Sequence, residues 1–261
     1  MHDADGVDER TMLAFARETR LSETTFVQSP TVAGADYRNR IWTIAGELPF
    51  AGHPSLGTAV AVGRAAGRAG EFSYVQQTRA GVQAVDVQLD GPAATASMLQ
   101  EPPTFGVAVN ATEAAAALGL PPEACNTDLP PQVVSTGLAH LMLQLRSVAD
   151  LARITPDFQA IHALLEPTGA FGIYAAYCDP AAGTAQARYF ASSPAIGEDP
   201  ATGSAAGPLC AYLHRHASCP TVEVTQGIEM GRPSHLKAET ANDRIRVTGD
   251  VVVLIDGTVR L

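Results

Sequence analysis

Two short stretches of the sequence place an ionisable residue directly before a proline and a run of small residues. They are HPSLGTA, which begins at His53, and DPATGSA, which begins at Asp199. Both have glycine at the fifth position, serine or threonine at the sixth and alanine at the seventh. An imidazole or a carboxylate can donate or accept a proton near neutral pH when its surroundings adjust its pKa. His53 and Asp199 are therefore candidate acid–base residues.

The small residues after each proline predict a helix, and the proline predicts where it begins. Proline suits the first helical position, because that position needs no backbone donor. His53 and Asp199 would then lie near two N-caps, and the first free N–H groups of each helix would attract an anion. A simpler interpretation stays open, in which Asp199 is only a helix cap and His53 only a loop histidine.

Three polar residues near these stretches have simpler explanations. We interpret Glu47 and Glu198 as structural carboxylates that hydrogen-bond loop backbone, since neither has an evident partner in the sequence. Ser204 lies in TGSAAG, which lacks the glycine-x-serine-x-glycine order of a nucleophile elbow. Its position at a helix start favours contact with an anion.

The elements that must position these residues also repeat along the chain. RIWT at 40–43 precedes His53, and RYFA at 188–191 precedes Asp199. Each half is therefore predicted to contain a hairpin, a loop, an ionisable residue, a proline and a small-residue helix. The hairpins are expected over 23–44 and 171–193, and the helices over 8–20, 55–67, 111–120, 155–166 and 204–217. Residues 101–110 are expected to be a connector, and short strands fill most of the rest.

Composition limits the class of protein. The chain has 261 residues with 46% hydrophobic and 17% charged, which is typical of a globular protein. Its formal net charge of −10 argues against nucleic-acid binding. No apolar run approaches the length of a membrane span, and the acidic N-terminus is not a signal peptide. The four cysteines show no metal-like spacing, so we expect free thiols, a cytoplasmic protein and no metal or organic cofactor.

Four stretches together resemble the PhzF-like phenazine biosynthesis family. They are LSETTFV (21–27), ELPFAGHPSLGTA (47–59), GEDPATGSAAGPL (197–209) and QGIEMGRPS (226–234). The resemblance implies an α/β (α+β) fold of the diaminopimelate-epimerase type. This fold has two pseudo-symmetric half-barrels, each a curved, mostly antiparallel sheet around a central helix, with the active site between them. The first half-barrel is expected over 1–108, joined by a strand near 251–261, and the second over 109–250.

The resemblance also implies a function, which is cofactor-independent isomerisation by proton transfer between carbons of a small carboxylate-bearing substrate. The glutamate of SETTF, here Glu23, is the implied acid–base residue, and His53 and Asp199 assist in proton handling. The residues implied to hold the substrate carboxylate are Gly52, Gly203 and Ser204. A homodimer is implied as well. No nucleic acid and no membrane are expected as partners.

Two alternatives remain from the sequence. Family members begin with a strand ahead of DADG, whereas this sequence starts almost at DADG, so another segment would have to cover the exposed sheet edge. A non-catalytic binding or scaffolding protein of the same fold is therefore one alternative, and an amino-acid epimerase-like enzyme is the other. Racemisation by two thiols is disfavoured, because no cysteine stands at either predicted helix start. An apolar pocket raising the pKa of Glu23 is expected from Phe26, Pro49 and Phe50.

Overall fold

The computed structural model describes residues 1–194 and 196–259, and the chain divides into two compact units. Unit 1 comprises Met1–Met98 and the segment from Thr248 onward, and unit 2 comprises Leu99–Val247. The division expected at 108 and 250 differs from this one. The expected connector contains a strand, β7 (Thr104–Ala108), which pairs with β8 (Gln132–Ser135) inside unit 2.

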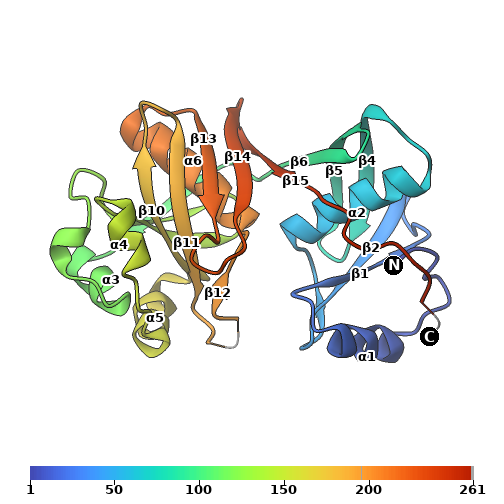
Figure 1. Ribbon diagram of the computed structural model, residues 1–261, viewed down its shortest axis with the longest axis horizontal. Helices are drawn as coiled ribbons and strands as arrows, with labels where there is room; N and C mark the ends of the chain where they lie inside the picture. Colours follow the sequence, from blue (N-terminus) through green and yellow to red (C-terminus); the bar gives the residue numbers. More distant parts are fainter. Residues whose placement is uncertain (195, 260–261) are drawn as a thin grey trace. The chain divides into compact units, whose positions relative to one another are not determined.

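Unit 1 is a sheet with two helices packed on it (Figure 1, blue to green). Its helices are α1 (Glu9–Thr19) and α2 (Gly52–Ala65), and its strands are β1 (Thr24–Gln28), β2 (Tyr37–Trp42), β3 (Glu47–Leu48), β4 (Gly70–Thr78), β5 (Gly81–Asp90) and β6 (Ala93–Leu99). The strand order is β1-β2-β4-β5-β6, with β3 paired to the end of β2. Only the β2–β4 pair among them is parallel.

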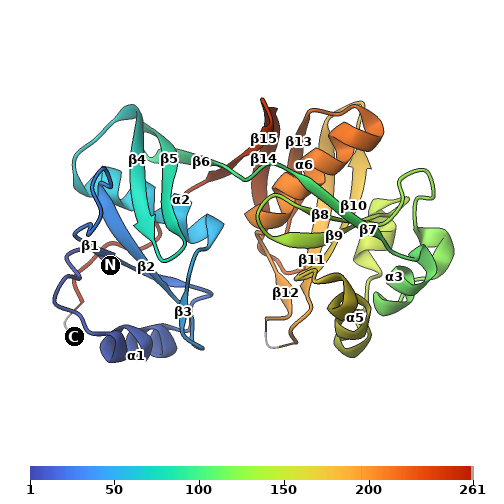
Figure 2. The same cartoon turned by 180° about the vertical axis from the view of Figure 1, so that it is seen from behind.

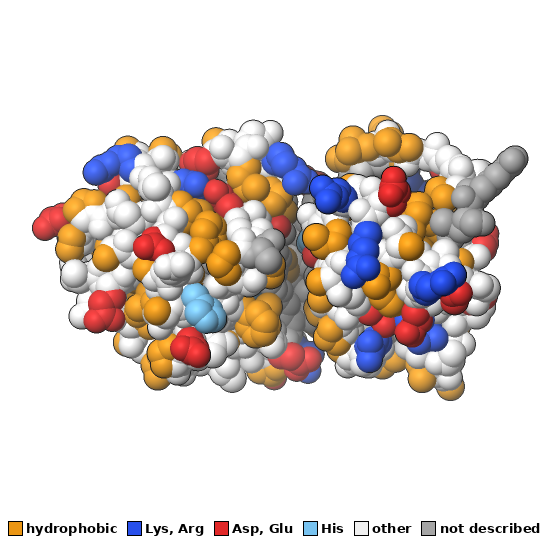
Figure 3. All heavy atoms as spheres, turned by 90° about the horizontal axis from the view of Figure 1, so that it is seen from below, with side chains coloured by type: hydrophobic (Ala, Val, Ile, Leu, Met, Phe, Trp, Pro, Cys, Tyr) orange, Lys and Arg blue, Asp and Glu red, His pale blue; other side chains and the backbone are white. Residues whose placement is uncertain are grey.

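Sequence periodicity explains how both helices of unit 1 pack. Asp8 caps α1, where its carboxylate accepts a hydrogen bond of 2.7 Å from the Thr11 N–H. The apolar side of α1 packs against β1 and β2, and its charged side is exposed, with acidic and basic side chains interspersed (Figure 3). In α2, Leu56, Ala59 and Val60 pack on the inward side chains of β5 and β6.

Unit 2 is a larger sheet with helices on both faces. Its helices are α3 (Ala111–Ala117), α4 (Val148–Ala152), α5 (Phe158–Leu165) and α6 (Gly203–Ala217), and its further strands are β9 (Ala139–Gln144), β10 (Gly172–Asp179), β11 (Thr184–Ala191), β12 (Glu198–Asp199), β13 (Thr221–Gln226), β14 (Ser234–Ala241) and β15 (Arg244–Asp250). The strand order is β15-β14-β13-β11-β10-β9-β8-β7, with β12 paired to β11. α6 covers one face, and α3 and α5 cover the other (Figure 2).

The two units repeat one topology. In unit 1, β1 and β2 form an antiparallel hairpin, β3 folds onto β2, and α2 leads to β4, which is parallel to β2. In unit 2, β10, β11, β12, α6 and β13 follow the same order with the same strand directions. The duplication and the α/β fold class predicted from the sequence are both confirmed.

The N-terminal residues cover part of the free edge of β1. The Met1 amino group donates to Thr25 O at 2.7 Å, Val27 N–H donates to Met1 O at 2.8 Å, and Ala4 N–H donates to Val27 O. Such alternation is the bonding pattern of a parallel pair. In unit 2, β9 runs parallel beside β10 in the corresponding place.

The prediction of a strand near 251–261 is wrong for residues 251–259. Val251 N–H donates to Ala94 O, but residues 251–259 form no strand, and several of their apolar side chains are exposed. An apolar run forms a strand only where a partner edge is available. The remainder of that expected strand lies outside the described residues. Within the described residues, no helix is long and apolar enough to span a membrane.

Candidate active site

Glu23 and His53 lie side by side in unit 1. Glu23 Oε2 lies 2.9 Å from His53 Nε2. The Glu23 side chain is 17% exposed and that oxygen is buried, whereas the His53 side chain is 48% exposed. The two atoms are within hydrogen-bond distance, although Oε2 makes no aligned hydrogen bond within the described residues. A buried carboxylate oxygen is thus paired with an accessible imidazole.

Hydroxyl contacts between β1 and α2 hold this pair together. Glu23 immediately precedes β1, and His53 is the second residue of α2. Two residues after Glu23, Thr25 lies with its hydroxyl 2.9 Å from that of Thr58, which stands on the second turn of α2. Glu23 and Thr25 share one side of the chain because side chains alternate along a strand. The start of β1 is therefore fixed against the first turns of α2.

Phe26 does not line the predicted apolar pocket around Glu23. Phe26 is fully buried in the cluster with α1, on the opposite face of β1 from Thr25. Pro49 and Phe50 are exposed. Strand alternation explains this outcome, since Phe26 and Thr25 are adjacent and must point to opposite faces.

The N-termini of α2 and α6 differ from those of the other α-helices in the described chain. Side chains of Asp8, Asn110, Ser147 and Asp157 cap α1, α3, α4 and α5. No side chain caps α2, which follows Ala51, or α6, which follows Thr202. The first N–H groups of these two helices therefore lack a capping side chain and retain their affinity for an anion.

Neither His53 nor Asp199 is a helix cap, and neither proline is at the first helical position. α2 begins at Gly52, so His53 and Pro54 occupy its second and third positions. Those positions need no backbone donor, because the first N–H groups of a helix have no intrahelical acceptor, so proline is tolerated there. α6 begins only at Gly203, and Asp199 lies before it in β12. The duplicated sequence thus starts its two helices at different places.

A buried glutamine explains the late start of α6. The Gln226 side chain is fully buried and accepts hydrogen bonds from Thr202 N–H at 3.1 Å and from the Tyr174 hydroxyl at 2.9 Å. Its amide donates to Asp199 O at 2.6 Å and to the Thr202 hydroxyl at 2.9 Å. The Thr202 hydroxyl in turn donates to the Asp199 carboxylate through a short hydrogen bond. This network holds residues 199–202 outside the helix and uses the hydroxyl that could otherwise have capped α6.

Ser204, the second residue of α6, contacts a histidine that the sequence analysis did not assign. Its hydroxyl lies 3.2 Å from His140 Nε2. His140 is on β9, is fully buried, and packs edge-on against Tyr189. Burial lowers the pKa of His140 to about 3, so its imidazole is neutral at physiological pH. No sequence signal identifies this contact, because its two residues are far apart in the chain and belong to no shared motif.

Glu47 and Glu198 have partners that the sequence analysis missed. Both oxygens of Glu47 accept hydrogen bonds from Arg40, and both oxygens of Glu198 accept from Arg188, at 2.8 Å each in the second pair. The two arginines are the first residues of RIWT and RYFA, so the repeat itself contained the signal. Each glutamate sits on the short strand, β3 or β12, that leads toward a helix mouth.

The glycines at the helix mouths are not required by packing. No described atom lies within 4 Å of a Cβ built on Gly52 or Gly57, and one on Gly203 would meet only Val247 at 3.8 Å. Deeper in α6, a Cβ on Gly207 would overlap the Gln100 side-chain amide. The small residues therefore serve packing within α6, whereas at the mouths they leave space beside the backbone N–H groups.

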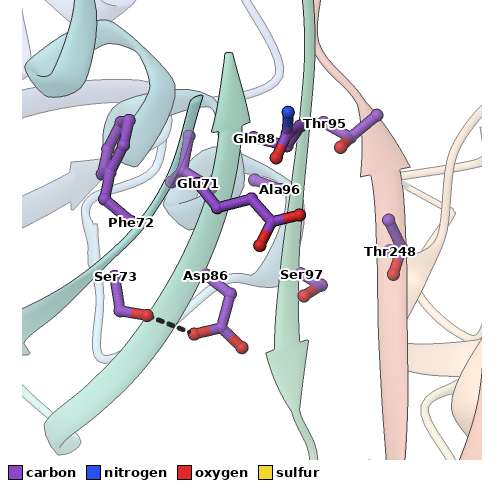
Figure 4. Close-up of a pocket in the computed structure, with 10 residues that line it drawn as sticks. Glu71, Phe72, Ser73, Asp86, Gln88, Thr95, Ala96, Ser97 and Thr248 are labelled. Carbon is purple, nitrogen blue, oxygen red and sulfur yellow. Dashed lines mark hydrogen bonds between the residues drawn. The ribbon is translucent and has the colours of Figure 1, made fainter. Parts of the chain in front are cut away.

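A groove of about 490 Å³ on the outer face of β4, β5 and β6 contains none of the predicted site residues (Figure 4). Its polar lining comes from side chains that alternate with those packed under α2. One of them, Ser73, donates to Asp86 at 2.6 Å. Among the described residues no cluster of histidine, cysteine and carboxylate could hold a metal. None of the four cysteines stands at the start of α2 or α6.

Comparison with known proteins identifies the family. The model of the phenazine biosynthesis-like PhzC-PhzF family matches residues 1–257. The chain belongs to the PhzC-PhzF family. It is 37% identical to the trans-2,3-dihydro-3-hydroxyanthranilate isomerase of Pseudomonas aeruginosa, over 98% of this chain and 90% of that protein.

Solved structures agree with this assignment. A protein of the PhzF family from Bacillus anthracis matches with a TM-score of 0.83 and 25% identity, covering 97% of this chain and 89% of that one. A protein from Pseudomonas aeruginosa, described as a predicted epimerase, matches with a TM-score of 0.81 and 31% identity, covering 97% and 90%. The chain is a PhzF-like isomerase.

Proposed function

We propose that this PhzF-like isomerase moves a proton between two carbons of a small carboxylate-bearing substrate, with Glu23 as the general acid–base residue. The observation that carries the proposal is the pair of Glu23 and His53, 2.9 Å apart. A carboxylate with one buried oxygen and an imidazole partner can accept a proton from carbon and return it. In that step a C–H bond breaks and its electron pair forms a new double bond, while the existing double bond opens and its electron pair takes up the proton at a second carbon.

Each remaining site residue has a role that its own surroundings support. His53, which is 48% exposed beside Glu23, would relay or polarise protons. Asp199, whose backbone Gln226 fixes, would do the same with its carboxylate. We assign carboxylate binding to the first N–H groups of α2 and α6 at Gly52 and Gly203, and to the hydroxyl of Ser204. The open Cβ positions at the two glycines support a ligand approaching the backbone there. The single cleft expected from the sequence stays a prediction.

The first substrate to test is trans-2,3-dihydro-3-hydroxyanthranilate, because the 37% identical relative is named for it. A panel of small cyclic and amino-acid-like carboxylates would follow. Incubation in deuterated water, read by NMR and mass spectrometry, would show label entering a substrate carbon. A moved double bond indicates isomerisation, whereas label at an inverted stereocentre indicates the epimerase alternative. Absence of turnover on the whole panel would favour the binding-protein alternative.

Glu23→Gln is the decisive variant. It keeps the shape of the side chain and removes the base, so we expect turnover to fall by about 10³-fold. Far-UV circular dichroism and the thermal midpoint should stay close to the wild type. Glu18→Gln, which removes an exposed carboxylate of α1, is the matched control and should leave turnover unchanged. Equal turnover in Glu23→Gln and the control would exclude Glu23 as the base.

Two broader properties stay predictions of the sequence and the family. A homodimer predicts a sedimentation mass of twice the chain mass of 27.2 kDa. A cytoplasmic location predicts that the protein fractionates with cytoplasmic enzymes.

A further inference from the structure

His140 lies beneath the start of α6 with only one of its two ring nitrogens partnered. Its Nε2 lies 3.2 Å from Ser204 Oγ. Its Nδ1 is buried and has no hydrogen-bond partner within the described residues. The Tyr189 ring, with centroids 5.3 Å apart, packs against the imidazole at 80°. The ring is thus enclosed, and among the described residues its only hydrogen-bond partner is the serine that we assign to carboxylate binding.

A neutral imidazole can make this contact in two ways. If Nε2 carries the proton, it donates to Ser204 Oγ, and the unpartnered atom is the Nδ1 lone pair. If Nδ1 carries the proton, Nε2 accepts from the serine hydroxyl, and a buried N–H group has no acceptor. Buried N–H groups without a partner are rarer than unsatisfied acceptors. The first tautomer is therefore favoured, and it leaves the hydrogen of the Ser204 hydroxyl uncommitted.

The corresponding residue in unit 1 is arranged differently. Thr58 occupies the place of Ser204 in the repeated sequence, and its hydroxyl donates to Pro54 O at 2.7 Å within α2. That hydrogen is used inside the helix. Ser204, at the start of α6, instead has the His140 ring nitrogen as its side-chain contact.

We infer that His140 is a positioning residue, whose Nε2–H donates to Ser204 Oγ and directs the serine hydroxyl hydrogen to the carboxylate of the substrate. The inference rests on the proposed function, which assigns Ser204 to carboxylate binding. Hydrogen bonds to a charged group are among the stronger ones, so the orientation of one hydroxyl affects substrate affinity measurably.

The tautomer can be measured on the resting protein without substrate. Long-range ¹H–¹⁵N correlation spectra of histidine-labelled protein separate the two neutral tautomers, and the spectrum of His140→Gln assigns the His140 signals by their loss. We expect a neutral ring with its proton on Nε2. A proton on Nδ1 would overturn the inference, even if the enzyme isomerises its substrate as proposed.

Kinetics with trans-2,3-dihydro-3-hydroxyanthranilate test the effect on binding. His140→Met keeps the length of the side chain but lacks a donor, and we expect KM to rise about tenfold with kcat within about twofold of the wild type. Ser204→Ala should behave in the same way, and the double variant should be no worse than Ser204→Ala. His140→Gln, whose amide can place an N–H near the position of Nε2, should restore most of the lost affinity.

Three outcomes count against the inference. They are an unchanged KM in His140→Met, additive effects in the double variant, and a loss confined to kcat. Thermal unfolding of each variant separates a folding defect from a binding defect. If His140→Met does not fold, two other measurements test the inference. They are the comparison of Ser204→Ala with His140→Gln and the tautomer spectrum. If the wild type turns over no substrate, the proposed function fails, and the tautomer spectrum still tests the hydrogen bond.

Discussion

Burial of the His140 imidazole makes the stability of the protein depend on pH. Its pKa is lowered from 6.5 to about 3 by desolvation, so between these values the unfolded chain binds a proton that the folded chain does not. The free energy of unfolding therefore falls as the pH drops below 6.5, by up to about 4 kcal/mol at pH 3. Urea unfolding at pH 7, 6, 5 and 4 would measure this slope.

Other titrating groups contribute to the same slope, so the comparison with His140→Met isolates the imidazole. Ser204 and Tyr189 are the polar side chains in contact with the ring, and burial also raises the pKa of Tyr189, which keeps it neutral throughout. We expect the wild type to lose more stability than the variant between pH 6.5 and pH 4. Parallel slopes would mean that His140 titrates in the folded protein as it does in the unfolded chain.

At the residue scale, the structure tests the contacts of the predicted site residues, and the sequence predicted only some of them. Glu23 and His53 come together, as a shared proton-transfer role requires. The alternative in which Asp199 is only a helix cap is wrong, because Gln226, distant in the sequence, holds residues 199–202 outside α6. His140 could not be found, since a buried histidine is recognised only by the side chains that the fold brings to it.

At the element scale, two arginine–glutamate pairs anchor the short strands ahead of α2 and α6. The Arg40 guanidinium lies 5.6 Å from the centroid of the Trp42 ring, and that of Arg188 lies 5.0 Å from the centroid of the Phe190 ring. Each arginine thus contacts an aromatic ring two residues further on and a glutamate across the hairpin. This arrangement explains why the arginine and the aromatic residue recur in both halves of the repeat.

Removal of one charge from either pair should destabilise the fold. In Glu198→Gln the buried guanidinium of Arg188 loses its carboxylate, and we expect the free energy of unfolding to fall by about 2–3 kcal/mol. Glu47→Gln should have a smaller effect, because Arg40, although equally buried, keeps Glu9 as a second carboxylate partner at 2.8 Å. Arg153→Ala, which breaks an exposed pair with Asp150, should change it by less than about 0.5 kcal/mol. Urea unfolding measures all three, and equal values for the three variants would contradict an anchoring role.

Elements were predicted well where polar and apolar residues alternate between clear turns. Both hairpins and the helices over 111–120 and 155–166 are present, with shifted ends. β7 was missed because most of its side chains are exposed, so its sequence lacks the alternation of a half-buried strand. The apolar run after Val251 gave the opposite error, because a strand was expected there and none forms. An apolar composition alone does not supply a partner strand.

At the scale of the whole molecule, each of the two units has its own core and its own side chains that can report its unfolding. The only tryptophan, Trp42, is buried in unit 1 beside α1. All four cysteines are in unit 2 and are free thiols. Burial raises the pKa of Cys178 and Cys210 to about 12, so these thiols react slowly with thiol reagents until their surroundings unfold. The chain thus reports the unfolding of each unit by a different signal.

We expect unit 2 to unfold at a higher urea concentration than unit 1. Its two clusters of buried apolar residues are larger than the two of unit 1, and burial of apolar surface is the main source of stability. Tryptophan fluorescence and thiol labelling would be recorded on the same samples after equilibration in urea. The fluorescence change should come first, and Trp42→Phe should abolish it without moving the labelling curve. Coincident midpoints and slopes would instead show that the chain unfolds as one cooperative unit, in which the cores of both units are lost together.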